Sequence, residues 1–265
     1  MSGVMNIAVS GMSAQADKLS VIANNIANSG TLAYKSQTAQ FSEAFVASGR
    51  TTASGSTIQY GTGAEVSSIT ADWDTGSAQV TNDQADILIS GDGFLPVSLG
   101  GSTYYTRACD FSLTYDNTTS EYVLMRSDGS VLSGYTDATM ATPALVSFAT
   151  QPTAIEIKSD GSVTAIDSTG AVIGTFNLGV TTFVNNDSLE SMGQGLYRAT
   201  TSSGAGTINT PGTGGAGSLT QGALEESNTD LVTEFTNMIV TQRAFQANSK
   251  VITTQDELLN TIITM

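Results

Sequence analysis

Apolar residues recur at helical spacing at both ends of the chain. Near the N-terminus they alternate between intervals of four and three positions, which places them in one seam: Met5, Val9, Met12, Ala16, Leu19, Ala23 and Ile26. This pattern predicts a helix over about residues 3–28. Asparagine side chains compete for backbone hydrogen bonds and favour caps, so the run Asn24, Asn25 and Asn28 before "SG" marks the end of that helix.

The C-terminal pattern is a longer heptad. Leu224, Leu231, Met238, Phe245, Ile252 and Leu259 recur every seven residues, and a more polar companion row contains Phe235, Gln242, Ser249, Asp256 and Ile263. The segment "ESNTD" supplies the cap candidates Ser227 and Asn228. We predict a helix over about residues 228–262, roughly 50 Å long. Its last third is apolar on more than one face, which predicts burial by more than one neighbouring helix.

The middle of the chain has the pattern of β-structure. Short runs rich in Val, Ile, Tyr and Phe, such as "ADILISGDGFLPVSL" and "VIGTFNLGVTTFV", are separated by Asp-Gly and similar turns. The pentapeptide "SDGSV" occurs at residues 127–131 and again at 159–163. We interpret it as two hairpin turns rather than as a duplicated domain.

Composition excludes several classes of function. The 265 residues have a net charge of −15, only 12% are charged, and the nine basic residues are dispersed. No basic stripe can follow nucleic acid, and anionic membranes are poor partners. The chain has no histidine and one cysteine, Cys109, so serine–histidine and thiol–imidazole catalysis, common zinc sites and intramolecular disulfides are excluded. We expect Cys109 to be a small buried side chain.

The sequence predicts neither a membrane span nor a cleaved signal. No run of about 18 apolar residues occurs, and the N-terminus lacks a basic segment followed by a continuous apolar one. These patterns are compatible with a cytosolic protein or with export by a route that needs no cleaved signal.

No motif points to a catalytic, metal or cofactor-binding site. "GDGF" lacks the third glycine of a dinucleotide loop and is interpreted as a tight turn, and the later glycine-rich stretch lacks the Gly-Lys-Ser/Thr of a P-loop. Acidic residues scattered through turns lack calcium-loop spacing: Asp83, Asp86, Asp92, Asp110 and Asp116. No pair of carboxylates is singled out for glycosidase-like chemistry.

Two interpretations of the terminal helices follow from the pattern. They could form one helix pair packed on the β-domain of the same chain, or they could complete their burial only in an assembly of several chains. The length of the C-terminal helix and its all-round apolar end favour the assembly.

Both end motifs resemble those of bacterial flagellar axial proteins, the rod, hook and hook-associated proteins. "NNIANSGTLAYK" is similar to the N-terminal signature at Asn24, Asn25, Ile26, Ala27, Asn28, Thr31, Tyr34 and Lys35. The C-terminal signature is matched by "SNTD" from Ser227, by Met238, Ile239, Gln242, Arg243, Phe245, Asn248 and Ser249, and by "TQDELL". "ADILISGDGFLPV" and "YYTRACDFSL" resemble mid-chain motifs of the family.

Two positions depart from the family pattern. Cys109 and Ala33 both stand where glycine is usual. A residue with a Cβ disfavours positive φ, so the sequence argues against a left-handed conformation at Ala33.

The resemblance implies an α+β fold whose N- and C-terminal helices pair as a coiled coil, with a β-rich middle domain. The implied organisation is an N-terminal inner helix at 1–28, an extended linker at 29–70, a β-rich outer domain at 71–220 and a C-terminal inner helix at 221–265. The helices would line an export channel. The asparagines would cap carbonyls and hydrogen-bond adjacent subunits at the bend between helix and linker.

The implied function is self-assembly of exported subunits into a helical tube that transmits motor torque. Expected partners are copies of the chain, neighbouring rod, hook-cap and junction proteins, and the type III export apparatus, with no cofactor. The expected assembly interface comprises Met5, Val9, Met12, Ala16, Leu19, Ala23, Asn24, Asn25, Ile26, Asn28, Leu231, Phe235, Met238, Gln242, Arg243, Phe245, Ser249, Ile252 and Leu259.

Within the family, different segments resemble different members. "TQDELLNTI" and "VLSGY" are similar to the hook protein, whereas the length of the chain, "PTAIEIKSDGSVTA" and "QGALEESN" are similar to the distal rod protein. A compact hook subunit is our first interpretation and the distal rod is its alternative. Outside the family, the rival interpretations are an extracellular fibre or adhesin subunit and an enzyme such as a muramidase-like partner of rod assembly.

Overall fold

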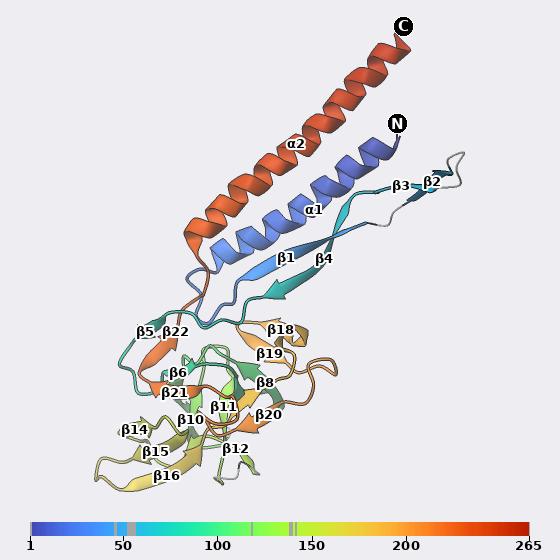
Figure 1. The fold of residues 1–265 in the computed structure, drawn as a ribbon. Helices are drawn as coiled ribbons and strands as arrows, with labels where there is room; N and C mark the ends of the chain where they lie inside the picture. The colour runs from blue at the N-terminus through green and yellow to red at the C-terminus, as the bar shows by residue number, and fades with distance from the viewer. Residues whose placement is uncertain are drawn as a thin grey trace. The chain divides into compact units, whose positions relative to one another are not determined.

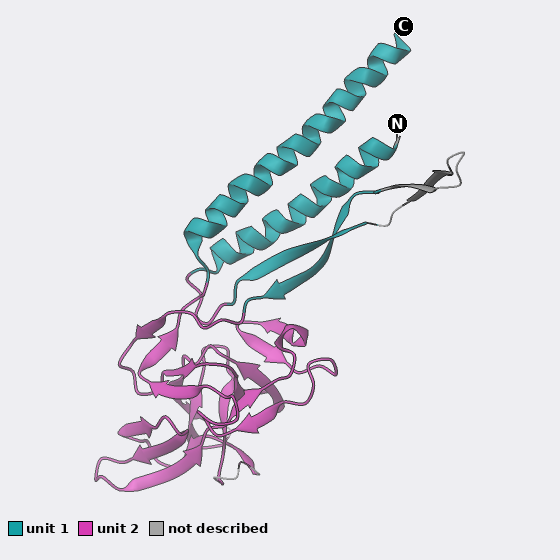
Figure 2. Cartoon of the chain, viewed as in Figure 1, with its two compact units in different colours: residues 1–29, 35–72, 229–265 teal, residues 30–34, 73–228 magenta. Residues whose placement is uncertain are grey.

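The computed structural model of the chain divides into two compact units (Figures 1 and 2). It describes residues 2–44, 47–51, 57–117, 119–137, 140 and 142–264. Unit 1 comprises residues 1–29, 35–72 and 229–265, and unit 2 comprises residues 30–34 and 73–228. The architecture is α+β, with helices near both ends of the chain and a β-rich middle.

Unit 1 contains both long helices. Its elements are α1 (Ser2–Ala27), α2 (Leu231–Ile263), β1 (Gln37–Glu43), β2 (Ala47–Thr51), β3 (Thr57–Tyr60) and β4 (Ala64–Ala71). The pair β1–β4 is antiparallel, with a bulge between Gln40 and Phe41, and β2 pairs with β3. The segment predicted as an extended linker, 29–70, therefore contains four strands, of which β1 and β4 pack beside α1 (Figure 1).

Both helices lie where the apolar pattern predicts them, but α2 begins three residues later than expected. Its N-cap is Asp230, whose carboxylate accepts hydrogen bonds from the Val232 N–H at 3.0 Å and the Thr233 hydroxyl at 2.6 Å. The predicted cap candidate Asn228 lies in unit 2 and donates its side-chain N–H to the Asp74 carbonyl instead. A carboxylate at this position also complements the positive end of the helix dipole.

The end of α1 is capped by residues that follow it directly. The Asn28 amide donates to the Asn24 carbonyl and to the Asn24 side-chain oxygen, both at 2.9 Å, and the Ser29 hydroxyl donates to the Ile26 carbonyl at 2.9 Å. These bonds satisfy carbonyl groups that the helix end leaves without partners. The amide-rich "NNIANS" segment is therefore a C-terminal cap within one chain.

Helices α1 and α2 pack antiparallel (Figure 1). Two contacts define their register. The Asn25 amide donates to Glu234 Oε1 at 3.0 Å, and a Cβ added at Gly11 would lie 2.8 Å from Asn248 Nδ2. The two contacts are fourteen residues apart on each helix. Gly11 thus admits the Asn248 side chain at a close crossing of the two helices.

Asn25 joins three elements of unit 1. Its side chain is fully buried, its amide donates to the Gln37 carbonyl at 2.8 Å, and its Oδ1 accepts the Gln37 N–H at 2.9 Å. This two-way bond imitates a β-bridge at the first residue of β1. Together with the Glu234 bond it connects α1, β1 and α2 through one amide group.

The regular secondary structure described in unit 2 consists of short strands and one 3-10 turn. The strands are β5 (Ala78–Val80), β6 (Ile87–Ser90), β7 (Leu95–Leu99), β8 (Ser102–Thr106), β9 (Ser112–Asp116), β10 (Glu121–Met125), β11 (Val131–Tyr135), β12 (Pro143–Leu145), β13 (Ser147–Phe148), β14 (Ala154–Ile157), β15 (Ser162–Ile166), β16 (Val172–Asn177), β17 (Val180–Thr182), β18 (Glu190–Gly193), β19 (Leu196–Arg198), β20 (Thr207–Asn209), β21 (Ser218–Gln221) and β22 (Ala223–Glu225), with the 3-10 turn at Asn186–Ser188. The largest sheet has the order β14-β15-β16-β11-β7-β8-β19-β18.

The repeated "SDGSV" segments are two hairpin turns, as predicted. They connect β10 to β11 and β14 to β15. In each turn the aspartate, Asp128 or Asp160, accepts hydrogen bonds from both the N–H and the hydroxyl of the serine two residues on. The glycine that follows has a positive φ, 84° at Gly129 and 88° at Gly161.

The core of unit 2 is apolar and includes the single cysteine. Phe94, Leu95, Leu124 and Leu132 are fully buried. Cys109 is 1% exposed, as the sequence predicted, and burial raises the pKa of its thiol far above the ordinary range. A protonated thiol in this position is a small apolar group rather than a nucleophile.

A buried ion pair joins four segments of unit 2. Arg107 Nε lies 3.0 Å from Glu225 Oε2, and the two side chains are only 2% and 1% exposed. The remaining guanidinium N–H groups donate to the carbonyls of Gly93 at 3.0 Å and Gly91 at 2.9 Å. Glu225 also accepts the Gly76 N–H at 2.9 Å. Both charges are thus paired and hydrogen-bonded, which is the condition under which a buried ion pair is tolerated.

Replacing Arg107 should destabilise unit 2 strongly, because Glu225 would remain buried without its cation. We expect Arg107→Leu to lower the free energy of unfolding by about 3–5 kcal/mol. The measurement is urea unfolding followed by near-UV circular dichroism. The matched control is Arg198→Leu, because Arg198 pairs with Glu190 at the surface, where the side chains are 51% and 48% exposed. Equal losses for both variants would contradict the assignment.

Removing the Asn25 side chain should loosen unit 1. Asn25→Ala leaves the Gln37 N–H without its acceptor in a buried position, at an expected cost of about 1–3 kcal/mol. Helix unfolding by urea, followed at 222 nm, measures this loss. Asn24→Ala, at a neighbouring exposed position of α1, is the control and should change the midpoint much less.

Helix α2 should weaken in acid through its cap. Hydrogen bonds from the Thr233 hydroxyl and the Val232 N–H lower the pKa of the Asp230 carboxyl below its ordinary value. The resulting stabilisation is present above the unfolded-state pKa of about 4 and is lost as the pH falls through the lower folded-state pKa. Asn caps without titrating, so Asp230→Asn should lose less helical signal than the wild type between about pH 5 and pH 2.

Candidate assembly interface

Most large apolar side chains that are exposed belong to unit 1. Among the described residues these are Val4, Ile7, Val9, Phe41, Ile69, Leu231, Val232, Phe235, Ile239, Val240, Phe245, Val251, Leu258, Ile262 and Ile263. Unit 2 exposes fewer, although it is the larger unit. An apolar surface of this extent on a helix pair indicates a site that other chains cover.

Helix α2 packs through a seam that contains both polar and apolar residues. Of its described side chains Thr241 alone is buried, and most of the half-buried positions form a heptad seam with it: Glu234, Met238, Asn248, Ile252, Gln255 and Leu259. Most other large apolar residues of α2 are exposed. A helix whose burial is complete within one chain keeps most of its large apolar residues covered.

The predicted residues of α1 divide into two rows. Met5, Met12, Leu19 and Ile26 are half-buried, whereas Val9, Ala16 and Ala23 are exposed. The fully buried positions of this helix are different residues, Ala8, Ala14, Val21, Ile22 and Asn25. The outer row of the predicted seam is therefore accessible along the length of α1.

The predicted residues of α2 divide in the same way. Met238, Ser249, Ile252 and Leu259 are half-buried, and Leu231, Phe235, Gln242, Arg243 and Phe245 are exposed. The predicted companion row lies one position beyond the observed packing seam, since Glu234 and Thr241 face inward where Phe235 and Gln242 face outward. The main predicted row therefore lies in the observed seam at Met238, Ile252 and Leu259, and only the companion row is shifted by one position.

The three asparagines expected at the interface have different environments. Asn25 is buried and bonded to Gln37 and Glu234 within unit 1. Asn28 is half-buried and bonded to Asn24, which is exposed. The sequence did not single out Glu234 as a partner of Asn25, because no local signal connects residues 209 positions apart.

Ala33 has a positive φ of 52°. The sequence argued against a left-handed conformation there because alanine replaces the usual glycine, and that expectation was wrong. The Ala33 N–H donates to the Glu225 carbonyl at 2.8 Å, and its side chain is buried. This long-range bond holds the left-handed conformation against a local cost of about 1–2 kcal/mol.

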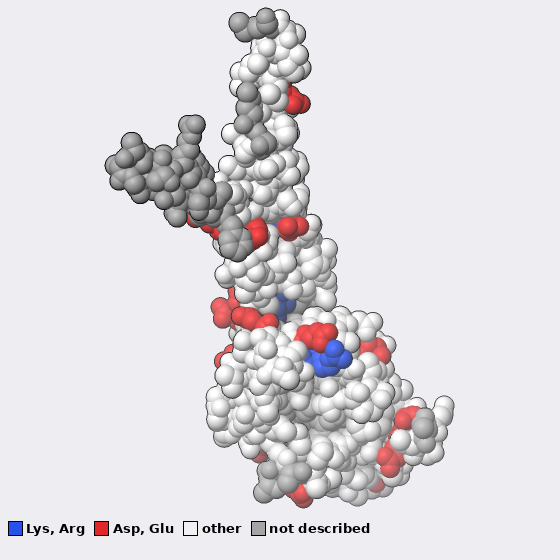
Figure 3. All heavy atoms as spheres, turned by 90° about the vertical axis from the view of Figure 1, so that its right-hand side faces the viewer, with Lys and Arg blue, Asp and Glu red and all other residues white. Residues whose placement is uncertain are grey.

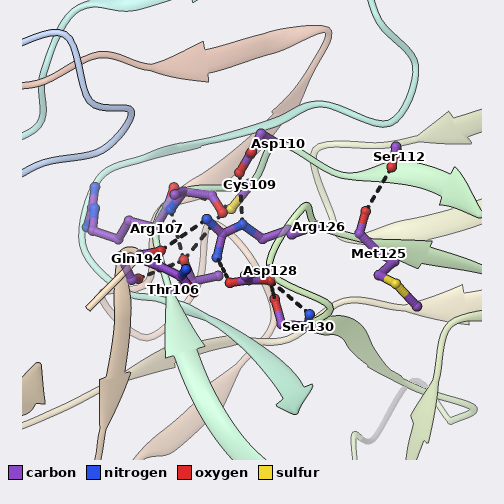
Figure 4. Close-up of polar contacts among 12 residues, drawn as sticks. Thr106, Arg107, Cys109, Asp110, Ser112, Met125, Arg126, Asp128, Ser130 and Gln194 are labelled. Atoms are coloured by element: carbon purple, nitrogen blue, oxygen red, sulfur yellow. Dashed lines mark hydrogen bonds and ion pairs between the residues drawn. The ribbon is translucent and has the colours of Figure 1, made fainter. Parts of the chain in front are cut away.

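The polar groups of unit 2 serve turns and ion pairs. Arg126 pairs with Asp110 and Asp128, both at 2.8 Å, and donates to the Gln194 carbonyl at 3.1 Å (Figure 4). Asp86 accepts the Thr81 hydroxyl, and burial raises the pKa of its carboxyl. Among the described residues no group of three or more His, Cys, Asp or Glu is placed to hold a metal.

The surface is sparsely charged. Figure 3 shows that on the face turned to the viewer most atoms belong to neither acidic nor basic residues. Within the described part of the chain, neither helix is long and apolar enough to cross a membrane. The exposed apolar side chains of α1 and α2 are thus the most prominent chemical feature of unit 1.

Three family models match separate parts of the chain. "Flagella basal body rod protein" covers residues 5–35, "Flagellar hook protein FlgE/F/G D1 domain" covers residues 88–173, and "Flagellar basal body rod FlgEFG protein C-terminal" covers residues 220–265. The first and last include most of α1 and all of α2, and the middle one lies within unit 2.

Similar proteins span nearly the whole chain. The flagellar basal-body rod protein FlgG of Bacillus subtilis is 39% identical over 97% of this chain and 96% of its own length, and FlgG of Caulobacter vibrioides is 34% identical over 96% of both. The flagellar hook protein FlgE of Escherichia coli is 27% identical over 97% of this chain and 98% of its own length. The chain therefore belongs to the family of flagellar basal-body rod and hook proteins.

Proposed function

We propose that this chain is a structural subunit of the flagellar rod that assembles with further copies into a tube. The observation that carries the proposal is the incomplete burial of α2, which leaves most of its large apolar side chains exposed, Phe235, Ile239 and Phe245 among them. Copies that pack side by side would bury these side chains at about 25 cal/mol per Å² of apolar surface. Heterologous contacts that do not close give a helical tube rather than a ring.

The rod is favoured over the hook by chain length. The FlgG relatives align over about 265 residues with nearly complete coverage of both chains, whereas the alignment with FlgE extends over 413 residues. The hook relative therefore contains long segments that this chain lacks. The hook, our first interpretation from sequence, becomes the alternative. Family membership speaks against a non-flagellar fibre or adhesin subunit.

We further propose that α1 and α2 form a coiled coil that lines an export channel. The two contacts that define their register are fourteen residues apart on both helices, which equals two heptads. In this proposal residues 1–28 and 221–265 form the inner layer, residues 29–70 connect it outward, and residues 71–220 form the outer wall.

The interface between copies would use the outward rows of both helices. On α1 it includes Val9, Ala16 and Ala23, flanked by the half-buried Met5, Met12, Leu19 and Ile26 and by Asn24 and Asn28. On α2 it includes Leu231, Phe235, Gln242, Arg243 and Phe245, flanked by Met238, Ser249, Ile252 and Leu259. Asn25 would contribute indirectly, because it holds the three elements of unit 1 together.

The remaining parts of the proposal concern location and partners. The subunit would be exported through the flagellar type III apparatus without a cleaved signal and would meet rod, hook-cap and junction proteins. Its role would be mechanical, with transmission of torque and no catalysis. Asp86, Asp110 and Asp128 of unit 2 support this role, because their carboxylates are engaged in a hydrogen bond with Thr81 or in ion pairs with Arg126.

Introducing a charge on the exposed face of α2 should prevent assembly. Phe245 lies in the heptad row of Met238 and Ile252 and is 38% exposed in the single chain, so Phe245→Asp leaves unit 2 folded but places an unpaired carboxylate inside the tube, at a cost of several kcal/mol. We expect loss of polymers by electron microscopy and sedimentation, with unchanged near-UV circular dichroism of unit 2.

The matched control is Phe245→Leu, which keeps an apolar side chain at the same position and should still assemble. Tubes of normal yield from Phe245→Asp would show that this face of α2 is not an interface between copies.

A further inference from the structure

A groove lies between α1 and the strand pair β1–β4. Its volume is about 420 Å³, and it is lined by Asp17, Ser20, Val21, Asn24, Gln37, Val66 and Ile69. Val21, Val66 and Ile69 supply its apolar surface, and Ile69 is 52% exposed. All lining residues belong to unit 1, so the groove is a feature of one compact unit.

An apolar knob lies at the opposite end of the same helix pair. In the antiparallel register Asn25 is level with Glu234 and Gly11 with Asn248, so the turns of α2 after about residue 257 extend beyond Ser2, where α1 begins. These turns carry Leu258, Ile262 and Ile263, which are 57%, 55% and 79% exposed. Figure 1 shows this end of α2 beyond the start of α1.

The knob cannot reach the groove of its own chain. The groove lies beside residues 17–24 of α1, which are level with the first turns of α2. Ile262 is more than twenty residues further along α2, a separation of about 35 Å along the helix axis. A second copy displaced along that axis, in contrast, brings its knob to the level of the groove.

We propose that the groove between α1 and β1–β4 is the docking site for the Leu258–Ile263 turns of α2 from a second copy of this chain. The two surfaces are complementary in chemistry, since both are apolar, and they lie at opposite ends of unit 1. Each copy therefore offers one groove and one knob, which produces a head-to-tail contact that continues without closing. This inference rests on the proposed function, because it requires that copies assemble.

Cysteine cross-linking in the full chain tests the contact. Ile69 and Ile262 are both about half exposed, so replacing them removes nothing from the core. The buried Cys109 is retained. In oxidised polymers of Ile69→Cys combined with Ile262→Cys, we expect covalent multimers that extend beyond dimers on a non-reducing gel. A mixture of the two single variants should give covalent dimers only.

The matched control pairs Ile69→Cys with Ile239→Cys, because Ile239 is equally exposed on α2 but lies about 35 Å from Ile262 along the axis. Its yield of covalent multimers should be at least about tenfold lower. Polymers that form without cross-links in the 69/262 variant, or equal yields from both pairs, would overturn this inference and leave the proposed function standing. A wild-type chain that never polymerises would overturn both.

Discussion

Helix α2 buries only part of its large apolar side chains within the chain and exposes most of them, and this arrangement governs how unit 1 can be stable. Within one chain Glu234 contributes a hydrogen bond, Asn248 approaches Gly11 closely, and the apolar members of the seam, Met238, Ile252 and Leu259, are only half-buried. The larger hydrophobic gain is available only when the outer faces are covered. In the proposed assembly, association of copies would complete the burial of this helix pair.

Unit 2 has the opposite character. Its core is complete within the chain, and the Arg107–Glu225 pair connects segments far apart in sequence. The "GDGF" turn contributes the carbonyls of Gly91 and Gly93, "YYTRACDF" contributes the guanidinium, and "GALEES" contributes the carboxylate. Three motifs by which the chain resembles its family thus meet in one buried polar cluster. The cluster is stable only when Arg107 and Glu225 lie next to each other, because either charge alone would be costly to bury.

The amide-rich segment after α1 shows how one sequence motif can have several structural roles. Asn28 closes the helix, Asn25 ties the helix to β1 and α2, and Ala33 adopts a left-handed conformation without the help of glycine. Local propensity explains only the first of these. The other two depend on Gln37, Glu234 and Glu225, residues that local sequence does not connect to them.

From the sequence alone it was possible to determine the two terminal helices, the β-rich middle, the hairpin turns at "SDGSV", the burial of Cys109 and the family. These features follow from spacing and turn chemistry, which act over a few residues. The tertiary structure decided which stripe of α2 faces α1, that Asp230 caps this helix, that the segment after α1 forms paired strands, and that Asn25 bonds within the chain. Those outcomes depend on contacts between residues that are far apart in the sequence. When a helix has apolar residues on several faces, its periodicity does not determine which face packs within the chain.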